Sequence, residues 1–423
     1  MNNPLGHLAK LARKAVEPIA IKGLLARERL ESGVSYHPGS AAVLADPYPK
    51  YAQMRQQDPV HRMRLLDGWA LTRYKDCDAV LRDHARFSNA IPSEVREQTG
   101  LISMLHQDQP EHTRLRALVS QAFTPRAIEK LRFRVEQTAE QLLDAVAGQP
   151  CFDLIAALAY PLPITIIADL MGVPPKDMDR FKDWSNDLAL SVEPFLPEDA
   201  MERVGGAAEE LTEYFEAIIA VRRREPRDDL ISVLLAAEEE GSKLTHDELI
   251  KTLILLLVAG NETTRNLIGN GMLALLSNPD QLQRLWDNPD LLNSAVKELL
   301  RYDPPVQLDG RVVRQDVEIG GKHIRAGQLV ISLIGAANRD PAVFEQPDVL
   351  DIGRKGTSHL SFGRGIHYCL GASLAELEGR IAFKTILQRF RSMRLAGEPK
   401  RRQQISLRGV EELWVEVAAG SDR

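Results

Sequence analysis

Apolar residues recur at helical spacing through most of the chain between about residue 110 and residue 300. Shorter stretches with the apolar and polar alternation of strands lie at residues 61–72, 311–319, 328–333 and 413–417. Helices and strands do not alternate regularly, as they would in a doubly wound α/β protein. The pattern therefore predicts a mainly α fold with small β-sheets, of the α+β class.

One predicted helix is much longer than the others. Thr245 and Glu248 have the spacing of a capping box, and no proline follows until Pro279. A helix over residues 246–276 would span ~45 Å at about 1.5 Å per residue, enough to cross a whole domain. Its residues 253–258 are apolar on every side, which indicates burial. We therefore expect this helix to run through the centre of the fold.

The chain divides into a short leader and one large domain. Residues 1–35 form an N-terminal leader, flexible or amphipathic, and residues 36–423 form a single domain without repeats or linkers. The basic leader is compatible with a peripheral membrane contact or with a solvated helix packed on the protein. Within the domain, Asn278 and Asn288 are each followed by proline, the signature of an N-cap with proline at the first helical position.

Composition and charge narrow the class of protein. The chain has 423 residues and a formal net charge of −6, which argues against the basic surface that nucleic-acid binding needs. No apolar stretch approaches the ~18 residues of a transmembrane span. The three cysteines, Cys77, Cys151 and Cys369, are too scattered for a disulfide framework or a zinc site. We expect a monomeric cytoplasmic protein that binds no nucleic acid.

A glycine-rich segment near the C-terminus carries the strongest chemical signal. Residues 362–371 read Phe-Gly-Arg-Gly-Ile-His-Tyr-Cys-Leu-Gly, and a helical pattern follows. Glycines allow backbone conformations closed to other residues, so a flat ligand could approach closely. A cysteine just before a helix N-terminus is favoured as a thiolate, whereas an isolated cysteine is more often a small buried apolar residue. Both interpretations of Cys369 are open on these grounds alone.

The pattern Phe-Gly-x-Gly-x-His-x-Cys-x-Gly resembles the haem-binding loop of the cytochrome P-450 family. The resemblance implies the haem-thiolate cytochrome P-450 fold, with the long central helix over the haem. It also implies that haem b (iron protoporphyrin IX) is the cofactor and that Cys369 is the ligand of its iron. The matching positions are Phe362, Gly363, Gly365, His367, Cys369 and Gly371, with Ala375 in the helix that follows.

A second motif lies in the middle of the long helix, where residues 259–264 read Ala-Gly-Asn-Glu-Thr-Thr. Burying Glu262 without a partner would be costly. Thr263 can bond a carbonyl one turn back and open the helix locally, and an acid beside an alcohol can relay protons. A purely structural pairing of Glu262 is the alternative. The segment resembles the oxygen-activating motif of the family, which implies that Ala259 lies at the cofactor, Thr263 orders dioxygen and Glu262 gates proton delivery.

Glu298 and Arg301 lie on one helix face at a spacing that permits an ion pair. Solvated surface pairs share this spacing, so the pair alone says little. The resemblance implies a buried, structural pair that braces the haem-binding core. The third partner in the family is an arginine, and Val349 occupies that place here. Arg354 or another side chain could substitute for it.

Four side chains could neutralise the two propionates of a haem, because buried charges need partners. Each of them alone would be an ordinary surface charge or imidazole. The resemblance implies the propionate role for His112, Arg116, Arg311 and His367.

By resemblance, the substrate pocket is built from mainly aliphatic segments, which suit an apolar or mildly polar substrate. The implied reaction inserts one oxygen atom of O2 into that substrate by hydroxylation or epoxidation. The pocket segments comprise Leu255, Val258, Val306 and Leu308, with residues 89–105, 185–200 and 405–407.

We expect the electrons to come from NAD(P)H through an external reductase and a ferredoxin. Arg114, Arg126 and Arg364 could form a basic docking patch for an acidic ferredoxin, or could be ordinary surface charges. Two other classes stay open: a peroxide-driven hydroxylase, and a non-catalytic haem-thiolate sensor or ligand-binding protein. Neither class needs the acid and alcohol at positions 262 and 263.

Overall fold

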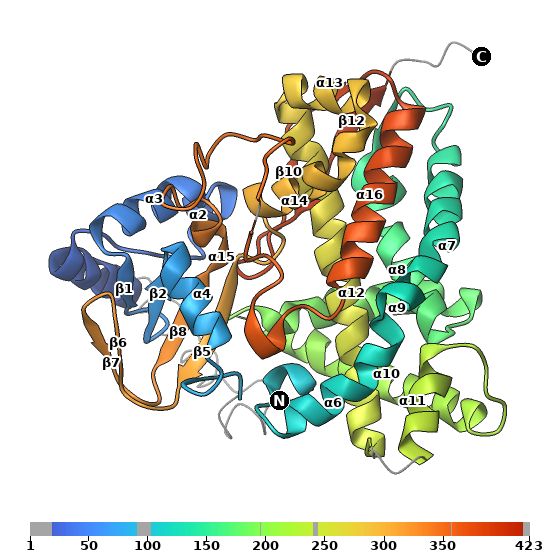
Figure 1. Cartoon of the computed structure of the whole chain (residues 1–423), viewed down its shortest axis with the longest axis horizontal. Coiled ribbons are helices and arrows are strands. Elements are labelled where there is room, and N and C mark those ends of the chain that lie inside the picture. Colours follow the sequence, from blue (N-terminus) through green and yellow to red (C-terminus); the bar gives the residue numbers. More distant parts are fainter. Residues whose placement is uncertain (1–18, 91–102, 195, 240–243, 357, 418–423) are drawn as a thin grey trace, which may run out of the picture.

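The computed structural model describes residues 19–90, 103–194, 196–239, 244–356 and 358–417. A region rich in strands lies on one side of the molecule and a larger group of helices on the other (Figure 1). This arrangement confirms the mainly α class with small sheets. Within the described ranges, no helix combines the length and the apolarity needed to cross a membrane.

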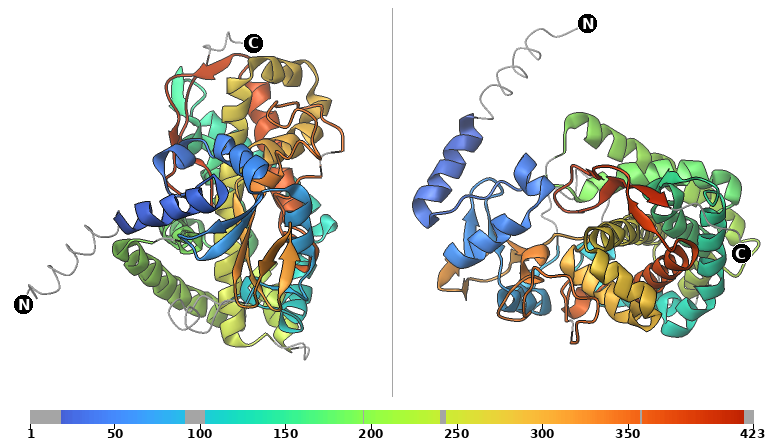
Figure 2. Two further views of the ribbon diagram at one scale, coloured as in Figure 1. Left: turned by 90° about the vertical axis from the view of Figure 1, so that its left-hand side faces the viewer. Right: turned by 90° about the horizontal axis from the view of Figure 1, so that it is seen from above.

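The helix α12 (His246–Ser277) is the central element of the helical region. Its capping box is formed as predicted: the Thr245 hydroxyl accepts from the Glu248 backbone N–H, and the Glu248 carboxylate accepts from the Thr245 N–H. The helix is continuous over 32 residues and buried along most of its length, which confirms the predicted core position (Figures 1 and 2). The helices packed against it include α8 (Pro161–Met171), α9 (Met178–Leu188), α10 (Glu198–Arg222), α14 (Leu292–Tyr302) and α16 (Ala372–Arg389).

The main sheet has the strand order β1-β2-β8-β5-β3. Only β2 and β8 pair in parallel; the other neighbours are antiparallel. The predicted stretch at 61–72 forms the β1–β2 hairpin, and the one at 328–333 contains β8. The bounds are β1 (Val60–Met63), β2 (Gly68–Leu71), β3 (Phe87–Ser88), β5 (Leu308–Val313) and β8 (Leu329–Leu333).

Smaller sheets complete the β structure. The predicted strand at 413–417 is the middle strand of a sheet ordered β4-β12-β9, and the stretch at 311–319 continues into a β6–β7 hairpin. A further hairpin, β10–β11, lies beside the central helix. The bounds are β4 (Cys151–Asp153), β6 (Val317–Ile319), β7 (Lys322–Ile324), β9 (Met393–Leu395), β10 (Lys400–Arg401), β11 (Val410–Glu412) and β12 (Trp414–Val417).

One of the two predicted asparagine caps is formed. The Asn288 side chain accepts from the Asp290 N–H at the start of a 3-10 turn that leads into α14. Asn278 precedes Pro279 at the start of α13 (Pro279–Asp287), but its side chain makes no cap bond. Its amide nitrogen instead donates to the Ala274 carbonyl, 2.8 Å away, so the preceding helix captures the amide. The remaining helices are α2 (Ala41–Ala45), α3 (Tyr48–Gln57), α4 (Tyr74–Arg82), α6 (Glu111–Ser120), α7 (Pro125–Asp144), α11 (Leu230–Glu239) and α15 (Ile334–Ala337).

The described part of the predicted leader is a helix over residues 19–32. It is joined to the sheet region by Glu28, whose carboxylate accepts from the backbone N–H groups of Tyr36 and Arg64. His61 lies between Glu28 and Asp58, with its ring nitrogens 3.3 Å and 3.0 Å from the two carboxylates. All three side chains are buried. Burial by itself lowers the pKa of His61, but the hydrogen bonds and charges of the two carboxylates outweigh it and raise the pKa above its ordinary value. Residues 1–18 lie outside the described part of the chain.

Candidate active site

The loop that leads into α16 has the conformation that its glycines predict. Gly363 and Gly365 have φ angles of +67° and +69°, in the left-handed region that disfavours other residues. A Cβ on Gly365 would lie 2.7 Å from the Leu81 carbonyl oxygen, so the loop also touches α4 through this glycine. The loop therefore requires both glycines, as a close-approach segment does.

Cys369 lies three residues before the first residue of α16, as predicted, with Gly371 as the N-cap. Its backbone N–H donates to the Phe362 carbonyl over 2.8 Å, which closes the loop. Burial raises the pKa of the thiol, while the Gly371 N–H and the charge of Arg116 act in the opposite direction. Arg116 also donates to the Tyr368 carbonyl. The thiol thus has two groups beside it that favour the thiolate once a metal cation is bound.

One face of the central helix is accessible, although the residues on its other faces are buried. Leu255, Val258, Ala259 and Thr263 are half-buried or exposed, and they recur at the spacing of one helix face. A helix that crosses a core normally buries all its sides, so this face borders a space within the fold. The predicted pocket residues Leu255 and Val258, and the predicted cofactor neighbour Ala259, all lie on it.

Thr263 and Glu262 are bound in different ways. The Thr263 hydroxyl donates to the Ala259 carbonyl over 2.8 Å, one turn back, as predicted. The predicted local opening is not seen, because the helix continues without a break through this turn. Glu262 is fully buried and forms ion pairs with Arg265, at 3.5 Å, and with Arg402. The buried acid therefore has the charged partners that its burial demands.

Imidazole groups and arginines meet beside the Cys369 loop. The rings of His112 and His367 lie 4.1 Å apart between centroids, and the pKa values of both are lowered by burial and by neighbouring cations. For His367 the pKa falls to about 3, with Arg311 and Arg116 among the cations that contribute. Nδ1 of His112 and Nε2 of His367 are buried without a partner among the described residues. These atoms and two cations suit a ligand that carries anionic groups.

Arg311 is buried in β5, as expected of a residue that meets a cofactor, but it already has protein partners. Its guanidinium pairs with Asp309 and donates to the Gly310 carbonyl over 2.7 Å. Together, a thiol, unpartnered imidazoles, two arginines and an accessible apolar helix face fit an iron porphyrin with two carboxylates. Cys369 would hold its iron, and His112, Arg116, Arg311 and His367 would lie nearest its anionic edge.

The predicted pair Glu298 and Arg301 is fully buried and bidentate, with hydrogen bonds of 2.7 Å and 2.8 Å. Arg354 supplies a third charge, since its Nε lies 3.2 Å and 3.1 Å from the two carboxylate oxygens of Glu298. The Val349 side chain is exposed, and only its carbonyl joins the cluster. Arg354 thus occupies the position that was open in the sequence, and the Asp351 N–H also donates to Glu298 over 3.0 Å.

The structure brings some of the predicted substrate-pocket segments together. Val306 and Leu308 are half-buried, and Val306 forms an isolated bridge with Leu407. The link between α9 and α10 is held to the same segment, because the Glu193 carboxylate accepts from the backbone N–H groups of residues 405–407, with the Ile405 bond at 2.7 Å. Of the predicted segment 89–105, residues 91–102 lie outside the described residues, as does residue 195.

The three arginines predicted as a docking patch differ in exposure. Arg126 is exposed at the start of α7. Arg114 pairs with Glu248, and Arg364 pairs with Asp78 at 3.3 Å and donates to the Ser358 hydroxyl at 2.8 Å. Arg126 has no ion pair among the described residues, whereas Arg114 and Arg364 each pair with a carboxylate, and a docking patch for a ferredoxin stays a prediction.

Two functional groups were missed in the sequence. Arg402 pairs with Glu262, which lies 140 positions earlier in the chain, and no local sequence pattern predicts this pair. Glu378 is buried in α16 next to Thr264, and burial raises its pKa to about 8. A signal for Glu378 was present, since it occupies the buried face of a helix whose other members on that face are apolar.

Comparisons with known proteins agree with this geometry. A family model described as Cytochrome P450 matches residues 68–409. The polyketide biosynthesis cytochrome P450 PksS of Bacillus subtilis is 42% identical, over 90% of this chain and 98% of its own length. Among solved structures, P450BioI in complex with hexadec-9Z-enoic acid ligated acyl carrier protein has a TM-score of 0.86 at 41% identity, covering 89% of this chain and 100% of its own. CYP109E1 from Bacillus megaterium in complex with testosterone has a TM-score of 0.84 at 36% identity, covering 90% and 100%.

Proposed function

Because this chain belongs to the cytochrome P450 family of haem-thiolate monooxygenases, we propose that it inserts one oxygen atom of O2 into an apolar or mildly polar organic substrate. The observation that carries the proposal is the accessible face of α12, which combines apolar Leu255 and Val258 with the Thr263 hydroxyl. When bound, the haem supplies the activation of dioxygen, for which a thiolate ligand is suited. The protein supplies the ligand, the protons and the apolar surface.

We assign proton handling to Thr263 and Glu262. The Thr263 hydroxyl donates a hydrogen bond to the Ala259 carbonyl, and it can rotate toward the accessible side of the helix. Glu262 is the adjacent acid, and it exchanges protons only when its contacts with Arg265 and Arg402 loosen. A peroxide-driven hydroxylase or a haem-thiolate sensor would not need this pair, so the pair favours the O2-dependent monooxygenase over both alternatives.

The substrate proposal rests on the apolar walls and on the relatives. PksS is named for polyketide biosynthesis, and the two solved structures hold a fatty acyl group on a carrier protein and a steroid. These compounds are large and mostly apolar. Hydroxylation or epoxidation of a molecule of this kind suits the aliphatic residues at 255, 258, 306 and 308.

For electrons we propose NAD(P)H, an external reductase and a small acidic ferredoxin. The exposed Arg126 lies at the N-terminal end of α7, which packs against the α16 helix that follows Cys369. A cation there attracts an acidic partner to the thiolate side. The chain would act as a monomer in the cytoplasm, with residues 36–423 as the monooxygenase domain.

The test is reconstitution of the haem-loaded protein with a surrogate ferredoxin, its reductase and NADPH. We expect the thiolate-specific absorption band of the reduced carbon-monoxide complex, and its loss in Cys369→Ala. Cys151→Ala is the matched control, because Cys151 is a half-buried cysteine on β4. An unchanged spectrum in Cys369→Ala would show that another residue holds the iron.

Thr263→Ala separates the proposed function from its alternatives. We expect product per O2 consumed to fall by about tenfold or more, because a lost proton donor typically costs ~10²–10⁴ in rate. Product formation driven by added hydrogen peroxide should fall much less. If both reactions fall equally, Thr263 acts only in packing. If the wild type forms product with peroxide but none with O2, NADPH and the redox partners, the peroxide-driven alternative holds.

A further inference from the structure

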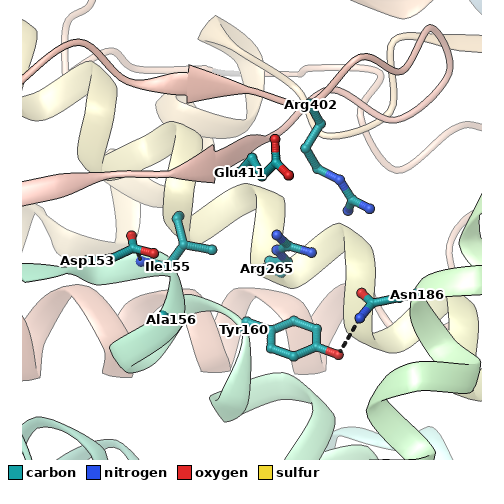
Figure 3. A pocket seen from close by; sticks show the side chains of 8 residues that line it. All are labelled: Asp153, Ile155, Ala156, Tyr160, Asn186, Arg265, Arg402 and Glu411. Carbon is teal, nitrogen blue, oxygen red and sulfur yellow. Dashed lines mark hydrogen bonds between the residues drawn. The ribbon is translucent and has the colours of Figure 1, made fainter.

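A cavity of about 340 Å³ lies against α12 and reaches the charged partners of Glu262. We call it the rear pocket; its walls include Ile155, Ala156, Tyr160, Asn186, Arg265 and Arg402. Figure 3 shows Arg265 rising from the helix and Arg402 reaching from the β10–β11 hairpin into the same space. Of the predicted substrate pocket, Asn186 from the segment 185–200 lines this cavity, whereas Leu255, Val258, Val306 and Leu308 do not.

The two arginines of the rear pocket have more donors than acceptors. Glu262 is their shared carboxylate, and it contacts Arg265 only at 3.5 Å. Nε of Arg265 is buried and has no hydrogen-bond partner among the described residues, and the whole residue is only 8% exposed. An unsatisfied buried donor on a cation is costly, so the site favours an acceptor that carries negative charge.

The other polar groups of the rear pocket are already engaged. The Tyr160 hydroxyl accepts from Asn186 over 3.0 Å and donates to the Lys182 carbonyl over 3.1 Å. Asp153 also lines the pocket, and its Oδ1 accepts from the backbone N–H groups of Ile155 and Leu413. These groups therefore shape the pocket, and its buried donor without a partner among the described residues is Nε of Arg265.

The carboxylates at the rim limit the charge of a ligand. Glu411 lines the pocket and pairs with Lys400 at 3.2 Å, so its charge is partly compensated. Glu411 and Asp153 would still repel a second negative charge on a ligand. The Tyr160 ring, 5.0 Å from the Arg265 guanidinium carbon, and the side chains of Ile155 and Ala156 offer apolar contact instead. The walls thus suit one anionic group attached to an apolar body.

We propose that the rear pocket binds an organic monocarboxylate, with its carboxylate on Arg265 and Arg402 and its apolar part against Ile155, Ala156 and Tyr160. A carboxylate matches the planar fork of a guanidinium group. The bound carboxylate competes with Glu262 for the same donors. Occupancy of the rear pocket is thereby coupled to the acid that lies beside Thr263.

The experiment titrates the haem-loaded protein with benzoate and with benzamide, its neutral counterpart of the same shape, by calorimetry at constant ionic strength. We expect saturable benzoate binding and at least tenfold weaker benzamide binding. Arg402→Gln should weaken benzoate at least tenfold, whereas Arg402→Lys, which keeps the charge, should weaken it less. Arg394→Gln is the control, because Arg394 is an exposed arginine on the neighbouring β9 that does not line the pocket.

Glu262→Gln tests the competition. Removing the internal carboxylate should tighten benzoate binding by several-fold, and weaker binding would overturn the coupling. Equal affinity for benzamide, no saturable benzoate binding, or binding that shifts the haem absorption band and persists in Arg402→Gln would overturn the rear-pocket site. None of these readouts requires turnover, so the result is independent of the monooxygenase assay.

Discussion

The surroundings of Glu298 and Glu262 contain the same parts in two different arrangements. Each carboxylate is fully buried and meets two arginines, one of them three positions along its own helix. Around Glu298, the Arg301 fork binds at 2.7 Å and 2.8 Å, and Arg301 also donates to the backbone carbonyls of Asn338 and Pro347. Around Glu262, Arg265 contacts the acid at only 3.5 Å and borders a cavity.

The difference shows how an ion cluster can either brace a fold or remain able to exchange partners. A buried pair with all its hydrogen bonds made loses much when any member moves. A cluster with an unsatisfied donor beside a cavity can rearrange at smaller cost. The first arrangement suits the support of the loop that contains Cys369. Ser361, just before that loop, donates to the carbonyl of Leu300 at 2.7 Å, and Leu300 lies on the same helix as Glu298. The second suits an acid that must gain and lose protons.

Glu298→Gln should give the largest effect. It leaves Arg301 and Arg354 buried beside a neutral group, and removing one partner of a buried pair costs about 3–5 kcal/mol. We expect a loss of this size in the free energy of unfolding, measured by urea denaturation. Glu129→Gln removes a glutamate of the same i,i+3 spacing from Arg132 on the surface, and it should cost far less, because the exposed pair is screened by water. Similar losses in both variants would contradict the bracing role.

Glu378 extends the comparison to a buried carboxyl group that has no ion pair with any described residue. Burial raises its pKa to about 8, so the folded protein holds this proton at neutral pH. The unfolded chain releases it near the ordinary value, so stability should fall as pH rises between about 5 and 8, by ~1.4 kcal/mol per pH unit. Glu378→Gln, which cannot lose a proton, should abolish this part of the slope. Urea denaturation at several pH values measures it, and an unchanged slope would show that Glu378 is ionised in the fold.

The smallest expected effect is the difference in stability between two variants, one at Arg354 beside Glu298 and one at Arg402 beside Glu262. Arg354→Gln should cost about 1–3 kcal/mol, because Glu298 loses a charged partner in a cluster that is fully packed. Arg402→Gln should cost less, because water in the adjoining cavity can take the place of its guanidinium beside Glu262. The midpoint of thermal unfolding of the two variants, measured side by side, gives the order. A larger loss for Arg402→Gln would mean that the Glu262 cluster is the bracing one.

Sequence patterns predicted the parts of the site that depend on neighbours along the chain. The bond from Thr263 to Ala259, the pair Glu298 and Arg301, and the position of Cys369 before a helix all arise from helical periodicity or a short motif. The local opening of the helix at Thr263 was predicted wrongly, since the helix continues without a break from His246 to Ser277.

Long-range partners could not be predicted from periodicity: Arg354 was only one candidate for the missing arginine, and Arg402 was not predicted. Arg354 lies 56 positions from Glu298, and Arg402 lies 140 positions from Glu262. Their contacts depend on how loops and hairpins pack onto the helices, which no periodicity in either segment encodes. The fold class and the strands at 61–72, 328–333 and 413–417 were predictable, since alternation within a strand reports its burial directly.

The helix over residues 19–32 has a consequence for protein engineering. Glu28 accepts from the N–H groups of Tyr36 and Arg64 and from His61, all of which belong to the domain that was predicted to begin at residue 36. A shortened chain that started there would leave the Arg64 N–H and Nε2 of His61 without their partner on Glu28. A tagged or shortened variant should therefore keep every residue from 19 onward. A library that varies the N-terminus should leave Glu28 unchanged.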